Sequence, residues 1–152
     1  MSLELTHTEF AKATPESVWH IWSDVSTWSQ WDHGVEWCRL KEGHKFELNG
    51  EGMLLPKGAP APVHFRIIEC TPTTSFTDEG ILELGSIHFF HQVIAYREGV
   101  NITHALKYFP GNLKAKEIFE AQIFPKLQKG LPESVKALAQ LAEQQSLRMI
   151  SL

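Results

Sequence analysis

The chain has 152 residues, of which 43% are apolar and 21% are charged, the balance of a globular domain rather than of a disordered segment. Its 18 acidic and 14 basic residues leave a net charge of -4, and no run of Lys and Arg marks a nucleic-acid-binding surface. No stretch approaches the roughly 20 apolar residues of a membrane span, so stable membrane insertion is not expected. We expect one domain over residues 1–152, long enough to bury a core of its own.

The N-terminal segment and the cysteines indicate where the protein works. Met1 to Phe10 alternates polar and apolar residues and lacks the basic and then apolar pattern of a secretion signal. Cys38 and Cys70 are the only cysteines, and two thiols without a secretory context favour the reducing cytoplasm. We therefore expect a cytoplasmic protein. Its oligomeric state is expected to be a monomer or a homodimer.

The first part of the chain predicts a strand followed by two short helices. Apolar residues that alternate with polar ones predict the strand over about 3–12. Thr14 can cap a helix over about 15–22, and Asp24 can cap a second short helix over about 25–31. All five tryptophans lie between residues 18 and 40, namely Trp19, Trp22, Trp28, Trp31 and Trp37. So much aromatic surface must be packed, and the C-terminal third supplies a long apolar partner.

From residue 35 onward the pattern becomes that of strands. Apolar runs between Gly- and Pro-containing turns predict strands over about 35–41, 46–55, 63–70, 75–83, 87–96 and 100–109. Gly50 and Gly52 lie inside the second of these strands, which predicts a bulge or sharp bend there. The loop over 56–62 holds three prolines and could form a stiff rim.

A long helical stretch follows the last strand. Asn112 is a plausible N-cap for it. Apolar residues recur at three and four positions and form one stripe, made of Phe124, Leu127, Leu131, Val135, Leu138 and Leu141. Pro125, Gly130 and Pro132 interrupt the stretch, which predicts a kink or a split near 125–132.

The order of these elements predicts an α+β fold of the helix-grip type. A curved antiparallel sheet of about 6–7 strands would wrap around the long C-terminal helix, with two short helices between strands 1 and 2. Antiparallel hairpins with one apolar face need a cover, and only the last helix is long enough to provide it. We expect an internal space between the sheet and this helix, and that space is the predicted functional site.

Motifs spread over nearly the whole chain resemble one known family. They read, in order, Ser17-Val18-Trp19, Ser23-Asp24-Val25, Trp28, Trp31-Asp32, Gly34-Val35, Gly50-Glu51-Gly52-Met53, Leu55-Pro56-Lys57-Gly58, Phe90-His91, Asn101-Ile102-Thr103-His104, Pro110-Gly111 and Leu131-Pro132-Glu133-Ser134-Val135. This series resembles the polyketide cyclase/dehydrase family of the START-like (SRPBCC) superfamily. The resemblance implies a helix-grip fold with a deep cavity for small, mostly apolar molecules. Phe109-Pro110-Gly111 departs from the usual Gly-Pro after the last strand and alters the predicted rim.

The resemblance leaves the chemistry open, because the superfamily includes lipid carriers, hormone receptors, cyclases, dehydratases and chaperone-associated domains. The last predicted hairpin offers candidate groups. If Glu98 and Gly99 form a two-residue turn, strand positions that sum to 197 face one another. His91 would then pair with Leu106 and lie diagonal to His104, roughly 7–8 Å away between Cβ atoms. Both imidazoles would face the helix, unless a bulge at Gly99 turned His91 outward.

Three functions remain open at this point. In the first, the cavity binds a small apolar or aromatic molecule, and His91, His104 and the Tyr108 hydroxyl orient its polar groups. The predicted binding residues are Trp22, Phe89, His91, Ile102, His104, Leu106, Tyr108, Phe124, Leu127 and Leu131. In the second, His91 or His104 acts as the general acid or base of a polyketide cyclase or dehydratase. In the third, the domain is a protein-interaction module with a vestigial cavity.

No metal or other cofactor is predicted. His88 and His91 are three apart on a strand, which sends them to opposite faces. The chain has no His-Glu-x-x-His motif, no paired cysteines and no phosphate-binding glycine loop.

Overall fold

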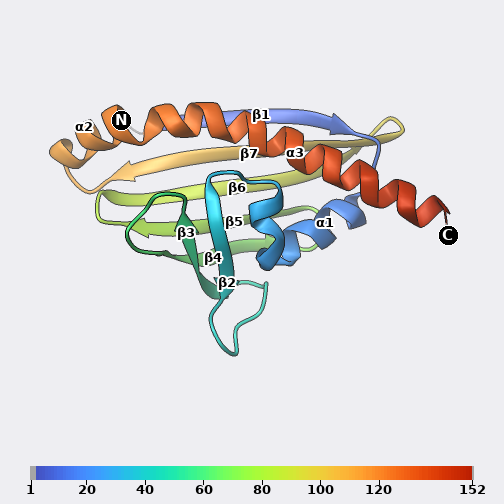
Figure 1. The fold of residues 1–152 in the computed structure, drawn as a ribbon, viewed down its shortest axis with the longest axis horizontal. Helices are drawn as coiled ribbons and strands as arrows, with labels where there is room; N and C mark the ends of the chain where they lie inside the picture. The colour runs from blue at the N-terminus through green and yellow to red at the C-terminus, as the bar shows by residue number, and fades with distance from the viewer. Residues whose placement is uncertain (1–2, 152) are drawn as a thin grey trace.

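The computed structural model describes residues 3–151, with side chains through residue 148. Its elements, in chain order, are β1 (Leu3–Ala11), α1 (Pro15–Ser23), η1 (Val25–Gln30), β2 (Val35–Leu40), β3 (Glu51–Pro56), β4 (Val63–Thr71), β5 (Ser75–Leu82), β6 (Gly85–Tyr96), β7 (Gly99–Pro110), α2 (Leu113–Gln122) and α3 (Phe124–Ser151). The seven strands form one antiparallel sheet in the order β1-β7-β6-β5-β4-β3-β2 (Figure 1). This confirms the predicted α+β class.

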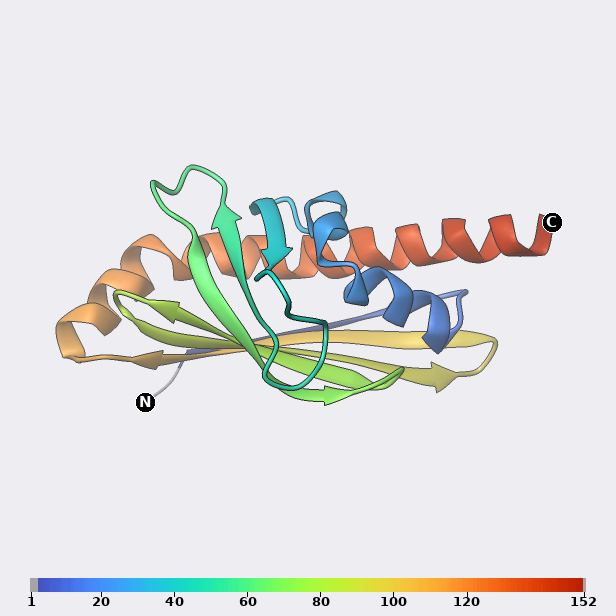
Figure 2. The same cartoon turned by 90° about the horizontal axis from the view of Figure 1, so that it is seen from below.

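The sheet curls around one side of the molecule, and the helices lie on that side (Figure 2). We call this side the inner face and the opposite side the outer face. α2 rises from the end of β7 to meet α3, and the loop between β3 and β4 projects toward the same side as α3. The prediction of a curved sheet around a long C-terminal helix, with short helices between the first two strands, is therefore confirmed.

The two short helices, which we call the brace, form where local signals place them. The Thr14 side chain accepts a hydrogen bond from the Ser17 backbone, and the Ser17 side chain accepts one from the Thr14 backbone, so α1 begins with a capping box. Pro15 occupies the first helical turn, where its missing N–H is not needed. Asp24 caps η1, which is a 3₁₀ helix.

The tryptophans of the brace pack mainly on aromatic rings of the sheet. In the brace, Trp22 and Trp28 are buried and Trp19 is half-buried; outside it, Trp31 directly after η1 is buried and Trp37 on β2 is half-buried. Trp22 meets the Phe76 ring edge-on at 5.4 Å, and Trp28 stacks on Phe65 at 5.9 Å. α3 adds aliphatic side chains to the same core, namely Val135, Leu138, Ala139 and Ala142. The sheet thus supplies the aromatic partners, and the helix supplies the aliphatic ones.

The strand predicted over 46–55 begins only at Glu51. Residues before it turn twice: the Gly50 N–H donates to the Glu47 carbonyl, and Asn49 has φ 70°. A Cβ on Gly50 would lie 2.1 Å from the Lys45 carbonyl oxygen, so the glycine serves this turn rather than a bulge. The register shifts lie elsewhere, between Val35 and Trp37 and between Ile67 and Glu69.

The β6–β7 register also differs from the prediction. Tyr96 pairs with Gly99, so Arg97 and Glu98 form the turn and paired positions sum to 195. Arg97 adopts φ 53°, a turn conformation that glycine usually provides. Because position 97 is not a glycine, no sequence signal indicated this turn. Because the shift is two residues, every side chain keeps its predicted face, but His91 now lies directly opposite His104.

The C-terminal helical stretch breaks earlier than predicted. α2 ends at Gln122 and α3 begins at Phe124, so the split lies just before 125–132. Pro125 falls in the first turn of α3, where a missing N–H costs no hydrogen bond. Pro132 lies inside α3, which continues through it with Leu131 and Val135 buried on the core side.

Gly52→Ala and Gly130→Ala should change stability in opposite directions. A Cβ on Gly52 would lie 2.5 Å from both the Arg39 carbonyl oxygen and the Phe65 ring, so we expect a loss of about 1–3 kcal/mol from overpacking. A Cβ on Gly130 would meet nothing within 4 Å, and alanine should stabilise α3 by about 0.5–1 kcal/mol. Urea unfolding of both variants measures the effects. Equal stabilities would contradict the packing described for β3.

Candidate functional site

Two neighbouring rows of side chains cross the inner face of the sheet. The first row consists of directly paired residues from four strands, His7, His104, His91 and Phe76. The second row lies two positions along each strand and consists of Leu5, Leu106, Phe89 and Asp78. One row is thus rich in rings that can form hydrogen bonds, and the other is apolar except for one carboxyl group.

His91 is held by the β5 strand beside it. It is 5% exposed, and its ring lies flat on the Phe76 ring, with centroids 3.9 Å apart and planes 5° apart. His91 Nδ1 lies 3.3 Å from the Phe76 carbonyl oxygen. A carbonyl can only accept, so Nδ1 carries the proton, and in the neutral ring Nε2 is an acceptor.

His104 is held by the brace. It is 3% exposed, and the Trp22 indole N–H donates to its Nε2 over 3.3 Å. An indole nitrogen can only donate, so the neutral His104 ring carries its proton on Nδ1. The His91 and His104 rings meet edge-on, with centroids 4.6 Å apart. The two imidazoles that the sequence placed on one face are therefore in contact.

Both buried imidazoles are neutral at neutral pH. Burial lowers the pKa of His91 to about 3, although hydrogen bonds to the backbone of Phe76 and Phe89 act in the opposite direction. Burial also lowers the pKa of His104 well below its ordinary value, and the neighbouring His91 and His7 lower it further. The pair can donate and accept hydrogen bonds but offers no positive charge.

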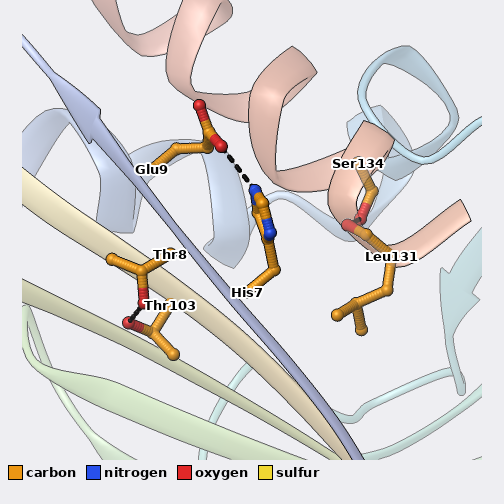
Figure 3. A network of polar contacts seen from close by, with 6 residues as sticks. All are labelled: His7, Thr8, Glu9, Thr103, Leu131 and Ser134. Atoms are coloured by element: carbon orange, nitrogen blue, oxygen red, sulfur yellow. Dashed lines mark hydrogen bonds and ion pairs between the residues drawn. The ribbon is translucent and has the colours of Figure 1, made fainter. Parts of the chain in front are cut away.

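The row continues to an ion pair at the edge of the sheet, between His7 and Glu9 of β1 (Figure 3). Both side chains lie on the inner side of the strand, toward Leu131 and Ser134 of α3. They are 29% and 28% exposed, so water reaches this end of the row. The sequence analysis missed the pair, although the alternation of β1 would have placed both residues on the inner face.

Asp78 is a further inward residue that the sequence analysis missed. It is 6% exposed and lies opposite Phe89 on one side and Ile67 on the other. Burial and, to a smaller extent, the nearby Asp32 together raise the pKa of its carboxyl group to about 8. Asp78 is thus mainly protonated at neutral pH. Its position two residues after the buried Phe76 was the only sequence signal for an inward carboxyl group.

The predicted binding residues divide between two parts of the core. Trp22 and Ile102 lie under the brace with His91 and His104, where the Trp22 ring contacts both imidazoles. The others lie near α2 and the start of α3: Phe89, Leu106, Tyr108, Phe124, Leu127 and Leu131.

Tyr108 is engaged within the second group. Its ring stacks on Phe119 at 3.7 Å, and its hydroxyl donates to the Leu84 carbonyl over 2.6 Å. The hydroxyl that was predicted to orient a ligand therefore already has a backbone partner, and the residue's clearest role is to tie β7 to the β5–β6 turn.

The second group is incompletely covered. Phe89 lies in an interior strand and faces α3, yet it is only half-buried. Phe124 and Leu127, on the first turns of α3, are half-buried against the same cluster. Apolar side chains from both layers thus remain partly open where the sheet and the helix face each other.

A separate groove of about 630 Å³ lies on the outer face. Thr6, Thr77, Phe90 and Ala105 line it between two ion pairs, Lys107–Glu4 at 3.4 Å and His88–Glu79 at 2.9 Å. It is a shallow hollow in the twisted sheet, on the opposite side from the predicted site.

Within the described residues, no group of three or more His, Cys, Asp or Glu side chains could hold a metal ion. Cys38 and Cys70 are free thiols, and burial raises the pKa of each. None of the described helices is both long and apolar enough to cross a membrane.

Asp78→Asn should change how stability depends on pH. The pKa of Asp78 is about 8 in the folded chain and near its ordinary value of about 4 in the unfolded chain. Between these values the folded state holds the extra proton, so the stability that this group contributes is lost as the pH rises. His91, with its pKa lowered to about 3, acts in the opposite direction but only below about pH 6.5.

Between about pH 6.5 and 7.5 the native chain should therefore lose up to about 1.4 kcal/mol of unfolding free energy per pH unit relative to Asp78→Asn. Chemical unfolding of both proteins at several pH values measures this difference. Parallel curves across that window would contradict a protonated Asp78.

Comparison with known proteins places this geometry in a family. Residues 2–143 match the family described as polyketide cyclase / dehydrase and lipid transport. No curated protein matches the chain in sequence.

Solved structures share the fold at low identity. The Zhui aromatase/cyclase from Streptomyces sp. R1128 is 13% identical, with 95% of each chain covered and a TM-score of 0.74. Norcoclaurine synthase from Thalictrum flavum is 12% identical, with 95% of this chain and 96% of that chain covered and a TM-score of 0.72. A protein from Chromobacterium violaceum is 18% identical, with 93% and 98% covered and a TM-score of 0.68. The match over nearly the whole length shows that the chain belongs to the polyketide cyclase/dehydrase and lipid transport family.

Proposed function

We propose that the protein binds a small apolar or aromatic molecule between the inner face of the sheet and the first turns of α3. The observation that carries this proposal is the exposure of Phe89. A phenylalanine in an interior strand, facing a helix, is normally covered, and here it stays half-buried, as do Phe124 and Leu127 of the same apolar cluster. Apolar surface of this kind, close to a few polar groups, is typical of small-molecule sites.

The polar groups at one end of this site would orient the ligand. Asp78 pairs directly with Phe89 across the strands, and His91 lies two residues further along β6. All of these groups are fixed by regular strands rather than by loops, which keeps their geometry constant. The neighbouring aromatic cluster under the brace borders that end of the site.

A small molecule is the partner that this site favours, and we expect the protein to act in the cytoplasm without nucleic acid. The family includes lipid transport, and one structural neighbour is named an aromatase/cyclase, which agrees with an apolar or aromatic ligand. Every residue of the proposed site belongs to one chain, so the site is the same in a monomer and in a homodimer.

A second candidate function is acid–base catalysis on such a ligand. The observation that favours it is the tautomer of His91, whose Nδ1 is fixed by the Phe76 carbonyl so that Nε2 can accept a proton.

Leu127→Trp should block ligand binding. The larger side chain would cover apolar surface of the half-buried cluster that the ligand is proposed to contact, so affinity should fall by at least about tenfold, which corresponds to about 1.4 kcal/mol. Quinones, sterols, fatty acids and aromatic polyketides are first screened by the native tryptophan fluorescence, and affinities are then measured by calorimetry. Leu113→Trp is the matched control, because Leu113 is 72% exposed at the start of α2. Equal affinities for the two variants would overturn the proposed location.

His91→Gln separates binding from catalysis. Glutamine keeps a side chain that can form hydrogen bonds but cannot take up a proton, so a binding protein should retain its affinity. If the protein is an enzyme, turnover of the same ligand should fall about 10²-fold while affinity persists. Product formation is followed by chromatography, and the absence of turnover in the native chain would remove the catalytic alternative.

A further inference from the structure

We propose that this site selects uncharged molecules that carry a hydrogen-bond acceptor, such as a ketone or a quinone oxygen, and discriminates against carboxylates. Asp78 and Trp31 would supply the donors. This inference rests on the proposed function, since it names the chemical class of the ligand. Its basis is the distribution of charge and of free hydrogen-bonding capacity on the inner face.

The inner face lacks a cation that could neutralise an acidic ligand. Among the described residues, the inward positions of the strands contain no Lys or Arg. Arg66 and Lys107 lie on the outer face, where Arg66 lies near Glu79 and Lys107 near Glu4. The lysines along the start of α3 are exposed, namely Lys126, Lys129 and Lys136. An ionised group buried without a partner is strongly unfavourable, so a carboxylate would lose affinity here.

The one inward group that could be cationic already has a partner. His7 lies against the Glu9 carboxylate at the edge of the sheet, so any positive charge on its ring already faces a negative partner. His104 and His91, the next two members of the same row, are buried and uncharged. The row therefore extends inward from the edge without a positive charge for an anion.

Asp78 is placed to donate a hydrogen bond. It pairs across the strands with Phe89, the half-buried residue that marks the proposed site. The titratable groups packed around it are Asp32 after η1, Cys38 on β2 and His91 on β6. None of them supplies positive charge; Lys57, whose charge acts on Asp32, is exposed on the loop after β3. With its raised pKa, the Asp78 carboxyl remains protonated and so can donate to a carbonyl oxygen.

Trp31 adds an independent observation. The residue is 2% exposed, and its indole N–H has no hydrogen-bond partner among the residues described. Trp31 directly follows η1, and its ring lies 5.5 Å from the His104 ring of β7. A buried donor without an acceptor is uncommon in folded proteins, and each such group calls for an explanation. A ligand oxygen would satisfy it, whereas a hydrocarbon would not.

The test compares ligands that share a body and differ in one group. Acetonaphthone, ethylnaphthalene and naphthoate, together with methyl undecyl ketone and laurate, are titrated into the native protein by calorimetry at about pH 6.5, near the ordinary pKa of histidine. We expect each ketone to bind at least about tenfold more tightly than its carboxylate, and acetonaphthone about fivefold more tightly than ethylnaphthalene. As the pH rises through about 8, the affinity for the ketones should fall, because Asp78 ionises and stops donating.

Three variants show which residue donates the hydrogen bond to the ligand, and a fourth, His7→Gln, is a control. Asp78→Asn keeps a donor, so it should retain the preference for the ketone and remove the fall in affinity at high pH. Asp78→Leu and Trp31→Phe each remove a donor, and at least one of them should bring acetonaphthone and ethylnaphthalene to equal affinity. His7→Gln should leave the ranking unchanged. Circular dichroism checks that each variant is folded. If Asp78→Leu and Trp31→Phe do not fold, the pH dependence of ketone binding by Asp78→Asn still tests the inference.

Three results would be decisive. Carboxylates that bind as tightly as ketones would overturn the inference and leave the proposed function intact. A preference for ketones that persists above pH 8 in the native protein, and in every donor variant, would exclude Asp78 and Trp31 as its source. Failure of all five compounds to bind would overturn the inference and the proposed function together.

Discussion

The stack of Phe76 on His91 fixes the position of nearly every other group in the candidate site. Phe76 also contacts Trp22 and Trp28 of the brace, and His91 contacts His104 on the next strand. The sheet, the brace and the polar row therefore meet at one pair of rings. Because the rings are desolvated, the same contact that packs the core also keeps the imidazole neutral and fixes its tautomer through the Phe76 carbonyl. Packing and chemistry are not separable here: a change that loosened the stack would alter the protonation of the site.

Much of the fold was predictable because its signals are local. The Thr14-Pro15 start of α1, the Asn112 cap of α2 and the alternation of β6 and β7 each depend on neighbouring residues, and the structure agrees with all three. The errors arose where conformation depends on distant packing. Arg97 adopts a positive φ without glycine, which moved the hairpin register by two residues. Pro132 is accommodated within α3 because Leu131 and Val135 hold that turn against the sheet, so a breaker residue did not break the helix.

The candidate site was only half predictable for a related reason. His91 and His104 could be placed on one face by parity alone, since a shift of two residues leaves the face unchanged. Asp78 and the His7–Glu9 pair could not be singled out, because an acidic residue in a strand usually faces water. Only the complete strand order shows that β5 is interior and that its position 78 lies beneath the brace. Tyr108 illustrates the opposite case. Its hydroxyl has suitable chemistry for a ligand but already donates a hydrogen bond to the Leu84 carbonyl.

The pairing of the first strand with the last has a consequence for how the chain folds. β2 to β7 form a series of hairpins between sequence neighbours, but β1 has its strand partner in β7, as in the pairing of Ala11 with Val100. At a synthesis rate of about 5–20 residues per second, β1 would wait roughly 5–20 s on the ribosome before that partner emerged. α3, which covers β1, is made later still. The sheet would thus be completed last at the strand that was synthesised first, and the apolar Leu3 and Leu5 would need protection from aggregation until then.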